Sequence, residues 1–332
     1  MNFRALLDSV VQSVLYVVTQ LRRLQYNRLK ALPLSRSRLG RKVIDAYLWP
    51  FDFAQVLRVY RKRVGRYPKL FRPETLNDYL QRNKLIGRSE RHMILADKVA
   101  VRDFVHKSIG AQYLKKLYWT GQDLSLVDKS ELPRSFIIKA AHLQGANIIV
   151  RDAENFDWEN AYQQGAEWLQ RDLSFRFVEW QYRWMPPRIL IEELLDSGEC
   201  DCPIDYKYWC FHGEIAMIQV DVIVGGYHEQ GLYSKAWERL PVQRNGKTAA
   251  KENWPPPEGV EEMNELAEKL SKGEPFVRVD FFHVGRPIFG EMTFHPCAGY
   301  RGFHPYEWEK ELGRLVTKRK LPVGNVKMIS EG

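Results

Sequence analysis

Two short segments near the C-terminal end alternate between apolar and polar side chains and are separated by a turn sequence. Residues 276–284 (FVRVDFFHV) are β-branched and aromatic, and their alternation places Arg278 and Asp280 together on one face of a strand. Residues 285–287 (GRP) supply turn chemistry, and residues 288–294 (IFGEMTF) have the pattern of a returning strand. The sequence therefore predicts a β-hairpin, which fixes two neighbouring strands of a sheet.

The hairpin brings two carboxylates close together. Asp280 and Glu291 are expected to lie side by side on the two strands, where like charges repel and partial burial raises the cost. A compensating cation is therefore expected. Carboxylate oxygens and the hydroxyl of Thr293 suit Mg²⁺, which usually takes one or two carboxylates plus waters or phosphates. Arg278 lies on the same face and offers an alternative, an ordinary ion network without a metal.

Length and charge limit the classes of protein that this chain can belong to. With 332 residues, 45% of them hydrophobic, the chain is long enough for two or three lobes around a substantial core. The formal net charge is +9, but residues 1–42 alone hold nine basic residues and one acidic residue. The rest of the chain is nearly neutral, so we expect no nucleic-acid partner.

The basic N-terminal segment also contains an apolar stretch. Residues 9–21 are too few to span a bilayer, and no small-residue cleavage site follows them. As a helix, the stretch has an apolar stripe followed by Arg22 and Arg23, which is typical of contact with the inner face of the plasma membrane. Packing of the helix on the rest of the protein is the alternative, and both remain open.

The cysteines indicate a reducing compartment. Four are too few to cross-link a chain of this size, which favours a cytoplasmic protein, peripheral at the membrane if the N-terminal segment binds lipid. A zinc site built from Cys200, Cys202, Cys210 and His212 is a weak alternative, because paired zinc cysteines usually stand two to four residues apart.

Other segments predict a mixture of helices and strands. Residues 92–109 have the pattern of one amphipathic helix, with Asp97 and Lys98 near its start. Two short strands flank a loop that contains Gly145, and Lys139 stands at the mouth of that loop, an arrangement that can fold over phosphates.

Two further strands follow along the chain. Residues 188–195 (RILIEELL) predict a buried strand that carries the acidic pair Glu192 and Glu193. A strand that begins at residue 205 is expected to continue to residue 224, and its Lys207 faces either a substrate or solvent.

Taken in order, these landmarks resemble those of the ATP-grasp superfamily, which includes D-alanine–D-alanine ligases. Residues 95–105, 205–215 and 278–305 resemble more closely the TupA-like ATP-grasp family of bacterial surface-polysaccharide and teichuronopeptide biosynthesis. The resemblance extends from about residue 68 to about residue 318, and it implies an α+β fold that holds the nucleotide between two lobes. The N-terminal segment lies outside the resemblance. We expect the chain to divide into a basic segment (1–42), a helical subdomain (43–110), a lid subdomain (111–187) and a central subdomain with the metal site (188–332).

The resemblance also implies roles for individual residues. Lys98 and Lys139 would contact the ATP phosphates, and Gly145 would belong to the loop that covers them. Residues 192–195 would form the hinge whose backbone meets adenine, so that Glu192, Glu193 and Leu195 are cofactor-binding residues, with Glu193 or Asp196 near the ribose. Mg²⁺ would be held by Asp280 and Glu291, with Thr293 where most of the superfamily has Asn. Arg278 and Lys207 would stabilise charge during catalysis.

The implied reaction is the joining of a carboxylate to an amine at the expense of ATP. The carboxylate would belong to a cell-surface glycan or its sugar precursor, and an amine would be the co-substrate. Three alternatives remain open: a phosphotransferase on the same fold, a glycosyltransferase-like capsule enzyme that uses a nucleotide sugar, and a non-catalytic scaffold at the membrane surface.

Overall fold

The computed structural model describes residues 3–172, 174–195, 202–246, 248–250 and 253–317. The predicted α+β class is confirmed, because helices and mainly antiparallel sheets share the described chain. The described helices are α1 (Phe3–Ala31), α2 (Arg38–Val64), α3 (Leu76–Ile86), α4 (Glu90–Ala96), α5 (Val101–Ile109), α6 (Trp158–Gln170), α7 (Ser174–Phe177), α8 (Val260–Ser271) and α9 (Tyr306–Thr317).

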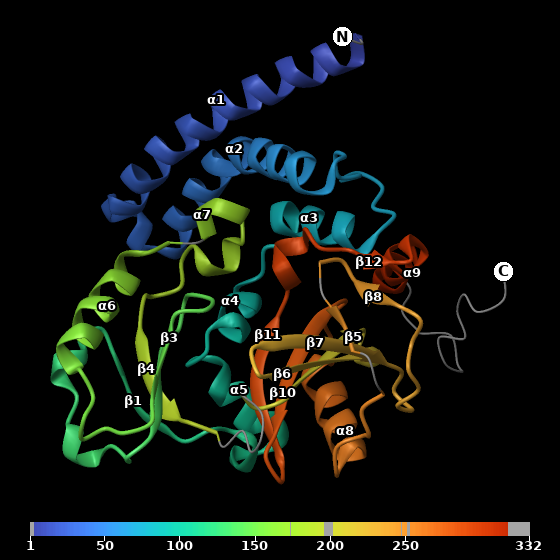
Figure 1. Cartoon of the computed structure of the whole chain (residues 1–332). Helices are drawn as coiled ribbons and strands as arrows, with labels where there is room; N and C mark the ends of the chain where they lie inside the picture. The colour runs from blue at the N-terminus through green and yellow to red at the C-terminus, as the bar shows by residue number, and fades with distance from the viewer. Residues whose placement is uncertain (1–2, 173, 196–201, 247, 251–252, 318–332) are drawn as a thin grey trace.

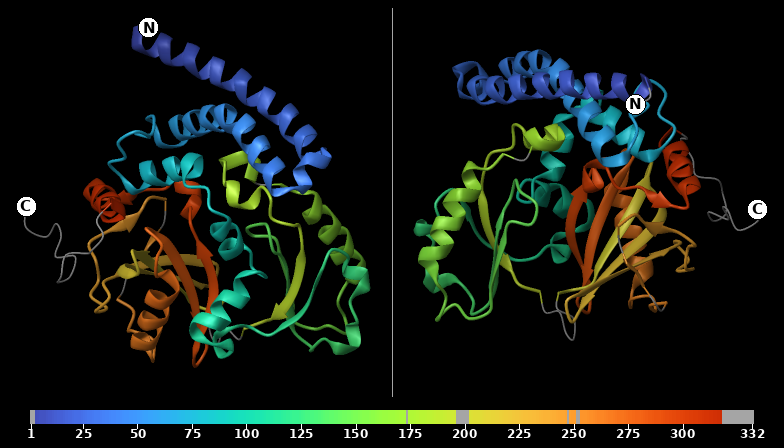
Figure 2. Two further views of the ribbon diagram at one scale, coloured as in Figure 1. Left: turned by 180° about the vertical axis from the view of Figure 1, so that it is seen from behind. Right: turned by 45° about the horizontal axis from the view of Figure 1, so that its top comes forward.

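The strands form two main sheets that stand side by side, with a layer formed by α1, α2 and α3 across one end of both (Figures 1 and 2). The small sheet has the order β1-β4-β2-β3, the large sheet β11-β10-β5-β6-β7-β9, and β12 pairs with β8. The strands are β1 (Leu117–Gly121), β2 (Phe136–Ala140), β3 (Asn147–Val150), β4 (Ile189–Glu193), β5 (Asp205–Phe211), β6 (Glu214–Val224), β7 (Tyr227–Tyr233), β8 (Gln243–Arg244), β9 (Thr248–Ala249), β10 (Val277–His283), β11 (Pro287–Thr293) and β12 (Phe303–His304).

Separate apolar cores support the two sheets. One face of the large sheet packs against α5 and α8, and its other face packs against α3 and α9. The small sheet packs against α6. Strand β4 belongs to the small sheet, where it pairs with β1 and β2. A division of the chain at residue 188 therefore separates β4 from the three strands with which it forms a sheet.

The prediction of one helix over residues 92–109 is wrong, because this segment forms two helices, α4 and α5, with a break between them. Asp97 causes the break: its carboxylate accepts hydrogen bonds from the backbone N–H groups of Val99 (2.8 Å) and Ala100 (3.1 Å). An aspartate that bonds its own backbone two and three residues on competes with the helical ladder. Lys98 consequently lies in the connection between two helices.

The prediction of one strand from residue 205 to residue 224 is also wrong, because these residues form a hairpin of β5 and β6. His212 and Gly213 have backbone φ angles of 52° and 88°, and they connect the paired ends Phe211 and Glu214. Two consecutive positive φ angles are what a tight two-residue hairpin turn requires, and glycine meets the requirement without strain. The turn reverses the chain, so β6 covers the edge of β5.

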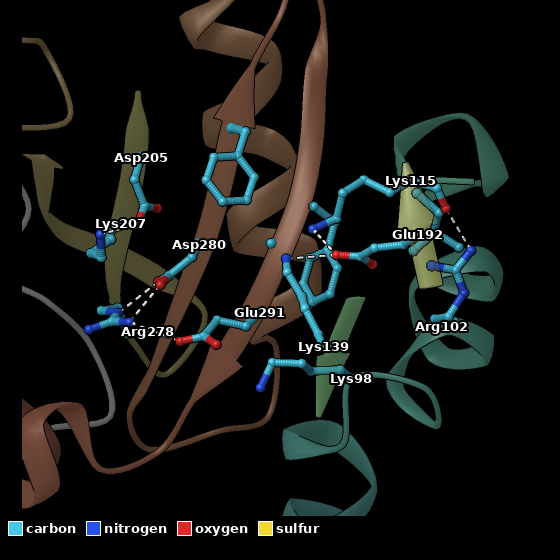
Figure 3. Close-up of a pocket in the computed structure, with 14 residues that line it drawn as sticks. Lys98, Arg102, Lys115, Lys139, Glu192, Asp205, Lys207, Arg278, Asp280 and Glu291 are labelled. Atoms are coloured by element: carbon cyan, nitrogen blue, oxygen red, sulfur yellow. Dashed lines mark hydrogen bonds and ion pairs between the residues drawn. The ribbon is translucent and has the colours of Figure 1, made fainter. Parts of the chain in front are cut away.

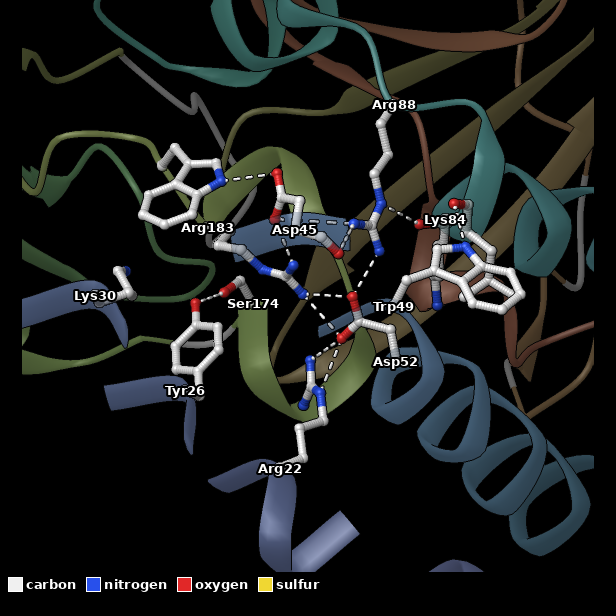
Figure 4. A network of polar contacts seen from close by, with 12 residues as sticks. Arg22, Tyr26, Lys30, Asp45, Trp49, Asp52, Lys84, Arg88, Ser174 and Arg183 are labelled. Carbon is white, nitrogen blue, oxygen red and sulfur yellow. Dashed lines mark hydrogen bonds and ion pairs between the residues drawn. The ribbon is translucent and has the colours of Figure 1, made fainter. Parts of the chain in front are cut away.

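A buried ion network fastens α1 to the rest of the molecule (Figure 4). Asp52 on α2 is fully buried and accepts hydrogen bonds from Arg22 of α1 (2.8 Å), Arg88 (2.5 Å) and Arg183 (2.9 and 2.7 Å). Tyr26 bonds Ser174 beside this network. The packing of the N-terminal helix on the protein body, one of the two alternatives drawn from the sequence, is therefore confirmed.

Polar side chains anchor much of the inward face of α1, and Tyr26 and Leu29 pack there in an apolar cluster. Asp8 binds Arg61, Gln12 bonds the hydroxyl of Tyr67, and Arg22 reaches Asp52. The outward stripe of α1 is apolar, with positions spaced by three and four residues as on one helical face. The exposed side chains of that stripe are Val10, Val14, Val17, Leu21 and Leu24.

Candidate active site

A cleft of about 210 Å³ lies between the small sheet and the large sheet, and both sheets contribute charged side chains to it (Figure 3). Lys115, Lys139 and Glu192 come from the side of the small sheet, and Lys98 comes from the connection between α4 and α5. Lys207, Arg278 and most of the carboxylates come from the large sheet. Its charged lining residues are Lys98, Arg102, Lys115, Lys139, Glu192, Asp205, Lys207, Arg278, Asp280 and Glu291.

The two carboxylates predicted on the C-terminal hairpin are direct neighbours. Asp280 on β10 pairs in register with Glu291 on β11, and Arg278 pairs with Thr293. At Gly290, beside this pair, a Cβ atom would lie 3.0 Å from the carbonyl oxygen of Asp280, which is a tight contact. The predicted hairpin and the pairing of Asp280 with Glu291 are confirmed, with a register shift between Asp280 and Phe281.

Arg278 organises the hairpin carboxylates. Its Nε and Nη2 donate to the two oxygens of Asp280 at 2.7 and 2.5 Å, and Nη2 also reaches Glu291 at 3.2 Å. Burial raises the pKa of Asp280, and Arg278 opposes that shift, while Asp205 and Glu291 add to it. More carboxylates converge here than one guanidinium neutralises, so the site retains a demand for positive charge.

The hairpin also fits a magnesium ion that is completed by phosphate and water. Glu291 keeps 38% of its side chain exposed, and Thr293 Oγ1 donates to its Oε1 at 2.9 Å. Among the described residues there is no group of three or more His, Cys, Asp or Glu side chains that could hold a metal by themselves. Two carboxylates are what Mg²⁺ takes when a substrate supplies its other oxygens. Arg278 must then share Asp280 with the ion.

Three lysines face these acids from the other wall of the cleft. Lys115 and Lys139 each place Nζ 2.8 Å from Oε1 of Glu192, and Lys98 donates to the carbonyl of Leu143 at 3.0 Å. Although burial opposes its ionisation, the two ammonium groups lower the pKa of Glu192 to about 2. One carboxylate does not balance three cations, of which Lys115 is buried and Lys98 and Lys139 are half-buried, and this wall consequently favours an anion.

Lys115 was not identified from the sequence. It stands two residues before β1, so the paired lysines at positions 115 and 116, next to this strand, were the available sequence signal. Burial lowers the pKa of Lys115 to about 8, and Glu192 opposes that shift. Its backbone carbonyl accepts a hydrogen bond from Arg102 at 2.7 Å. Lys115 is therefore held in a fixed position, and its protonation state responds to pH near 8.

An apolar pocket of about 280 Å³ adjoins the charged cleft. Lys115, Lys139, Asp205, Lys207 and Phe282 line both spaces. Flat apolar walls beside a cationic cleft suit a heterocyclic base joined to phosphates. The other residues that form the walls of this pocket include Ile137, Ile149, Leu194, Leu195 and Ile223.

The predicted hinge residues divide between the two spaces. Glu192 lines the charged cleft, whereas Glu193 and Leu195 line the apolar pocket. Glu193 accepts a hydrogen bond from the backbone N–H of Lys116 at 3.1 Å. Asp196, the other candidate for contact with a ribose, lies outside the described residues.

Lys207 faces the cleft rather than solvent. It forms ion pairs with Asp205 and, at 2.6 Å, with Asp221. Burial lowers its pKa, but these carboxylates outweigh burial, and the pKa of Lys207 is raised. Lys207 is therefore charged beside Arg278 at neutral pH.

Gly145 does not line the cleft. It lies in the loop between β2 and β3 with a φ angle of 69°, a conformation that favours glycine. The contact between this loop and the cleft is made by Leu143, whose carbonyl binds Lys98.

The weak zinc alternative gains no support from the described residues. Cys210 is buried in the core of the large sheet, and His212 Nε2 contacts the carbonyl of Val316 at 2.9 Å. Cys200 lies outside the described residues.

The chain was compared with known proteins. The model of the TupA-like ATP-grasp family matches residues 78–317. No curated protein matches the chain. Among solved structures, the D-alanine–D-alanine ligase from Bacillus anthracis complexed with ATP has 14% identity and a TM-score of 0.37, covering 60% of this chain and 55% of that one. The ATP-grasp ligase PsnB, complexed with a precursor variant, Mg and ADP, has 9% identity and a TM-score of 0.42, covering 86% and 71%.

Proposed function

This chain belongs to the TupA-like ATP-grasp family, and from that premise we propose that it is a Mg·ATP-dependent carboxylate–amine ligase of cell-surface polysaccharide biosynthesis. The observation that carries the proposal is the cleft in which Lys115 and Lys139, from the side of the small sheet, share the lining with the paired carboxylates of the large sheet. A nucleoside triphosphate with a divalent cation suits this arrangement, because its phosphates would meet the lysines and its cation would meet the carboxylates.

The two adjoining spaces fit the two ends of ATP. The base would lie in the apolar pocket near Ile137 and Leu195, and the phosphates would extend into the charged cleft toward Lys98, Lys115 and Lys139. Asp280 and Glu291 would hold Mg²⁺, which offsets charge on the phosphate oxygens. Glu192 then acts as the counter-charge that keeps the lysines in place before the nucleotide arrives.

The chemistry requires charges that are already in position. A carboxylate oxygen of the first substrate attacks the γ-phosphorus, and ADP leaves with the electrons of the broken P–O bond. The amine nitrogen then attacks the carbonyl carbon, phosphate leaves, and the nitrogen loses a proton. Arg278 and Lys207 would stabilise charge in these steps. Closure of the small sheet over the large one would exclude water, which otherwise hydrolyses the acyl phosphate.

Product analysis tests this function. The full chain is incubated with Mg·ATP, an acidic glycan and a mixture of amino acids, and the nucleotide, phosphate and glycan products are measured. ADP, inorganic phosphate and an amide-modified glycan in equal amounts are expected. ADP with a phosphorylated glycan and no free phosphate would instead identify a phosphotransferase. No consumption of ATP with any glycan would reject both and favour the glycosyltransferase or scaffold alternatives.

We further propose that the layer of α1 and α2 contacts the anionic inner face of the plasma membrane. Most of the exposed large apolar side chains among the described residues lie on these two helices. The outward stripe of α1 is joined by exposed Leu39 and Val43 on α2, with exposed Arg36, Arg38 and Lys42 nearby in the chain. An apolar stripe with adjacent cations matches an anionic lipid surface. No helix of the described chain has the length and apolarity needed to span a bilayer.

A further inference from the structure

A pocket of about 490 Å³ lies between the start of α2, helix α4 and the segment that follows α7. It is separate from the charged cleft, because the two spaces share no lining residue. Its inner wall belongs to the buried ion network, since Asp45 and Arg88 line the pocket and also take part in that network (Figure 4). Three segments far apart in the sequence therefore build this pocket.

The carboxylates that line the pocket already have partners. Glu90 forms an ion pair with Arg38 at 2.5 Å. Asp45 accepts hydrogen bonds from Arg183 at 2.6 Å and from the indole Nε1 of Trp184 at 3.0 Å. The negative charge of the pocket is thus taken up within the protein.

Two cations of the pocket lack such a partner. Lys42 is exposed, and Arg41 is half-buried and donates its Nε to the backbone carbonyl of Ser35 at 2.9 Å. Among the residues that the structure describes, no carboxylate lies within ion-pair distance of either cation. Trp180 also lines the pocket and is buried, and its indole N–H has no acceptor in the described part of the chain. The pocket therefore has more donors and positive charge than its own acceptors satisfy, which favours an anionic ligand.

Exposed apolar side chains lie beside these cations. Ile94 of α4 lines the pocket and is exposed. On α2, the exposed Leu39 and Val43 are four residues apart and form a stripe next to the one that carries Arg38 and Lys42. A ligand that suits this site offers an anionic group to the pocket and apolar surface to its surroundings.

We propose that the pocket binds the phosphate of a membrane lipid, with one lipid per chain. The phosphate oxygens accept hydrogen bonds from Arg41 and Lys42, and the acyl chains contact Leu39, Val43 and Ile94. A soluble phosphate compound offers the first interaction alone, and a zwitterionic headgroup brings a positive charge toward the two cations. The proposal deepens the proposed membrane contact and rests on it, since it adds a defined headgroup site to a general attraction.

Calorimetric titrations of the full chain test the proposal with three soluble probes. Two are the short-chain lipids dihexanoylphosphatidylglycerol and dihexanoylphosphatidylcholine, each used below its critical micelle concentration. The third is glycerol 3-phosphate, which has the phosphate without acyl chains. The test variant is Arg41→Gln with Lys42→Gln. The matched control is Arg28→Gln with Lys62→Gln, which removes two exposed cations from α1 and α2 outside the pocket. Arg41→Lys with Lys42→Arg keeps the charge and checks for a purely structural effect.

We expect the phosphatidylglycerol probe to bind at least about tenfold more tightly than either other probe, with one molecule per chain. The test variant should lose at least about tenfold in affinity for it, while the control and the charge-retaining variant stay within about threefold of the wild type. Equal binding of glycerol 3-phosphate would identify a site for a free phosphate compound, and equal binding of phosphatidylcholine would show that the headgroup charge is not recognised. Either result, an unaffected test variant, an equal loss in the control or no lipid binding would overturn the proposal.

Sedimentation with phosphatidylglycerol vesicles, measured on the same proteins, separates failure of the pocket from failure of the membrane contact. If the wild type sediments, a failed titration counts against the headgroup site and leaves the membrane contact in place. If the wild type does not sediment, the membrane contact itself is rejected, and the lipid site is rejected with it.

Discussion

Asp280 and Glu291 are register partners on the antiparallel strands β10 and β11, and only Glu291 of the two remains substantially exposed to the cleft. Asp280 is bound on both of its oxygens by Arg278. The pair therefore combines a fixed carboxylate with an accessible one. In the proposed enzyme, Glu291 is the ligand that a Mg·ATP complex meets first.

Replacing Glu291 by Gln should lower ATP turnover at least about a hundredfold, a loss of the size seen when one charge-stabilising group is removed from an active site. Burial opposes the ionisation of Glu291, but Lys98 and Arg278 lower its pKa, so the wild-type side chain is charged at neutral pH. Glutamine keeps the shape and removes the charge. The measurement is steady-state ADP release, with the exposed Glu214→Gln as control. Turnover by Glu291→Gln within threefold of wild type would remove Glu291 from the metal site.

The affinity for ATP should fall as the pH rises above about 8. Burial lowers the pKa of Lys115 to about 8 in the free protein, and an adjacent phosphate would raise it again. In the free protein the charged form that attracts phosphate therefore predominates below pH 8, is half lost near pH 8 and disappears above it. Binding measured by fluorescence of a nucleotide analogue between pH 6.5 and 9.5 tests this. Lys115→Arg should flatten the profile, because arginine stays charged. Parallel profiles for the two proteins would exclude Lys115 as the cause.

Asp52→Asn should destabilise the protein by about 3 kcal/mol or more, because it leaves buried Arg22 and Arg183 facing a neutral side chain. Burial raises the pKa of Asp52, but the arginines outweigh burial and lower it. A lowered pKa means that this stabilisation is present above the ordinary aspartate pKa and is lost as the pH falls through the lowered value.

Urea unfolding at pH 7 measures the effect of Asp52→Asn. Asp8→Asn is the control on the same helical layer, since Asp8 pairs with Arg61 while both side chains are about one third exposed. That control should change the free energy of unfolding much less, because solvent screens a partly exposed ion pair. A similar free energy of unfolding for the two variants would show that the buried network is not what fastens α1.

Val14→Asp together with Leu21→Asp should weaken binding to anionic vesicles at least tenfold. Both side chains lie on the outward stripe of α1 and do not contribute to its packing on α2. The assay is sedimentation with phosphatidylglycerol-containing vesicles, and neutral phosphatidylcholine vesicles test the contribution of charge. Phe71→Asp with Leu126→Asp places the same charges on other exposed apolar positions. Unchanged sedimentation of the α1 variant would contradict the lipid contact. The contact would also be contradicted if the wild type were a dimer and only the α1 variant were a monomer.

Local patterns predicted the parts of the fold that depend on neighbouring residues. The alternation of residues 276–294 predicted the β10–β11 hairpin and the shared face of Arg278 and Asp280, because a period of two fixes the face of each side chain. The pairing of Asp280 with Glu291 also depends on a register shift between Asp280 and Phe281, which the alternation does not report. The break at Asp97 was missed, since the apolar periodicity runs through it and only the side-chain hydrogen bonds of Asp97 interrupt the helix. A pattern of burial alone does not report such competition.

Features that depend on distant segments were not predictable in the same way. Lys115 meets Lys139 only because β1 and β2 flank β4, an order that no local pattern encodes. The polar contacts on the inward face of α1 are explained by Asp52, thirty residues from Arg22, and by Arg183 in another part of the chain. The family resemblance suggested a shared role for Asp280, Glu291 and Lys139, but it did not predict these contacts.

The most direct test of a shared ATP site is a calorimetric titration of ATP into the wild type and Lys139→Gln, each with Mg²⁺ and with the metal removed by a chelator. Lys139 comes from the small sheet, and the proposed metal ligands come from the large one. We expect one ATP per chain, an affinity at least tenfold weaker in Lys139→Gln, and a further loss when Mg²⁺ is removed. Absence of ATP binding to the wild type, or equal affinities for all four combinations, would contradict the account.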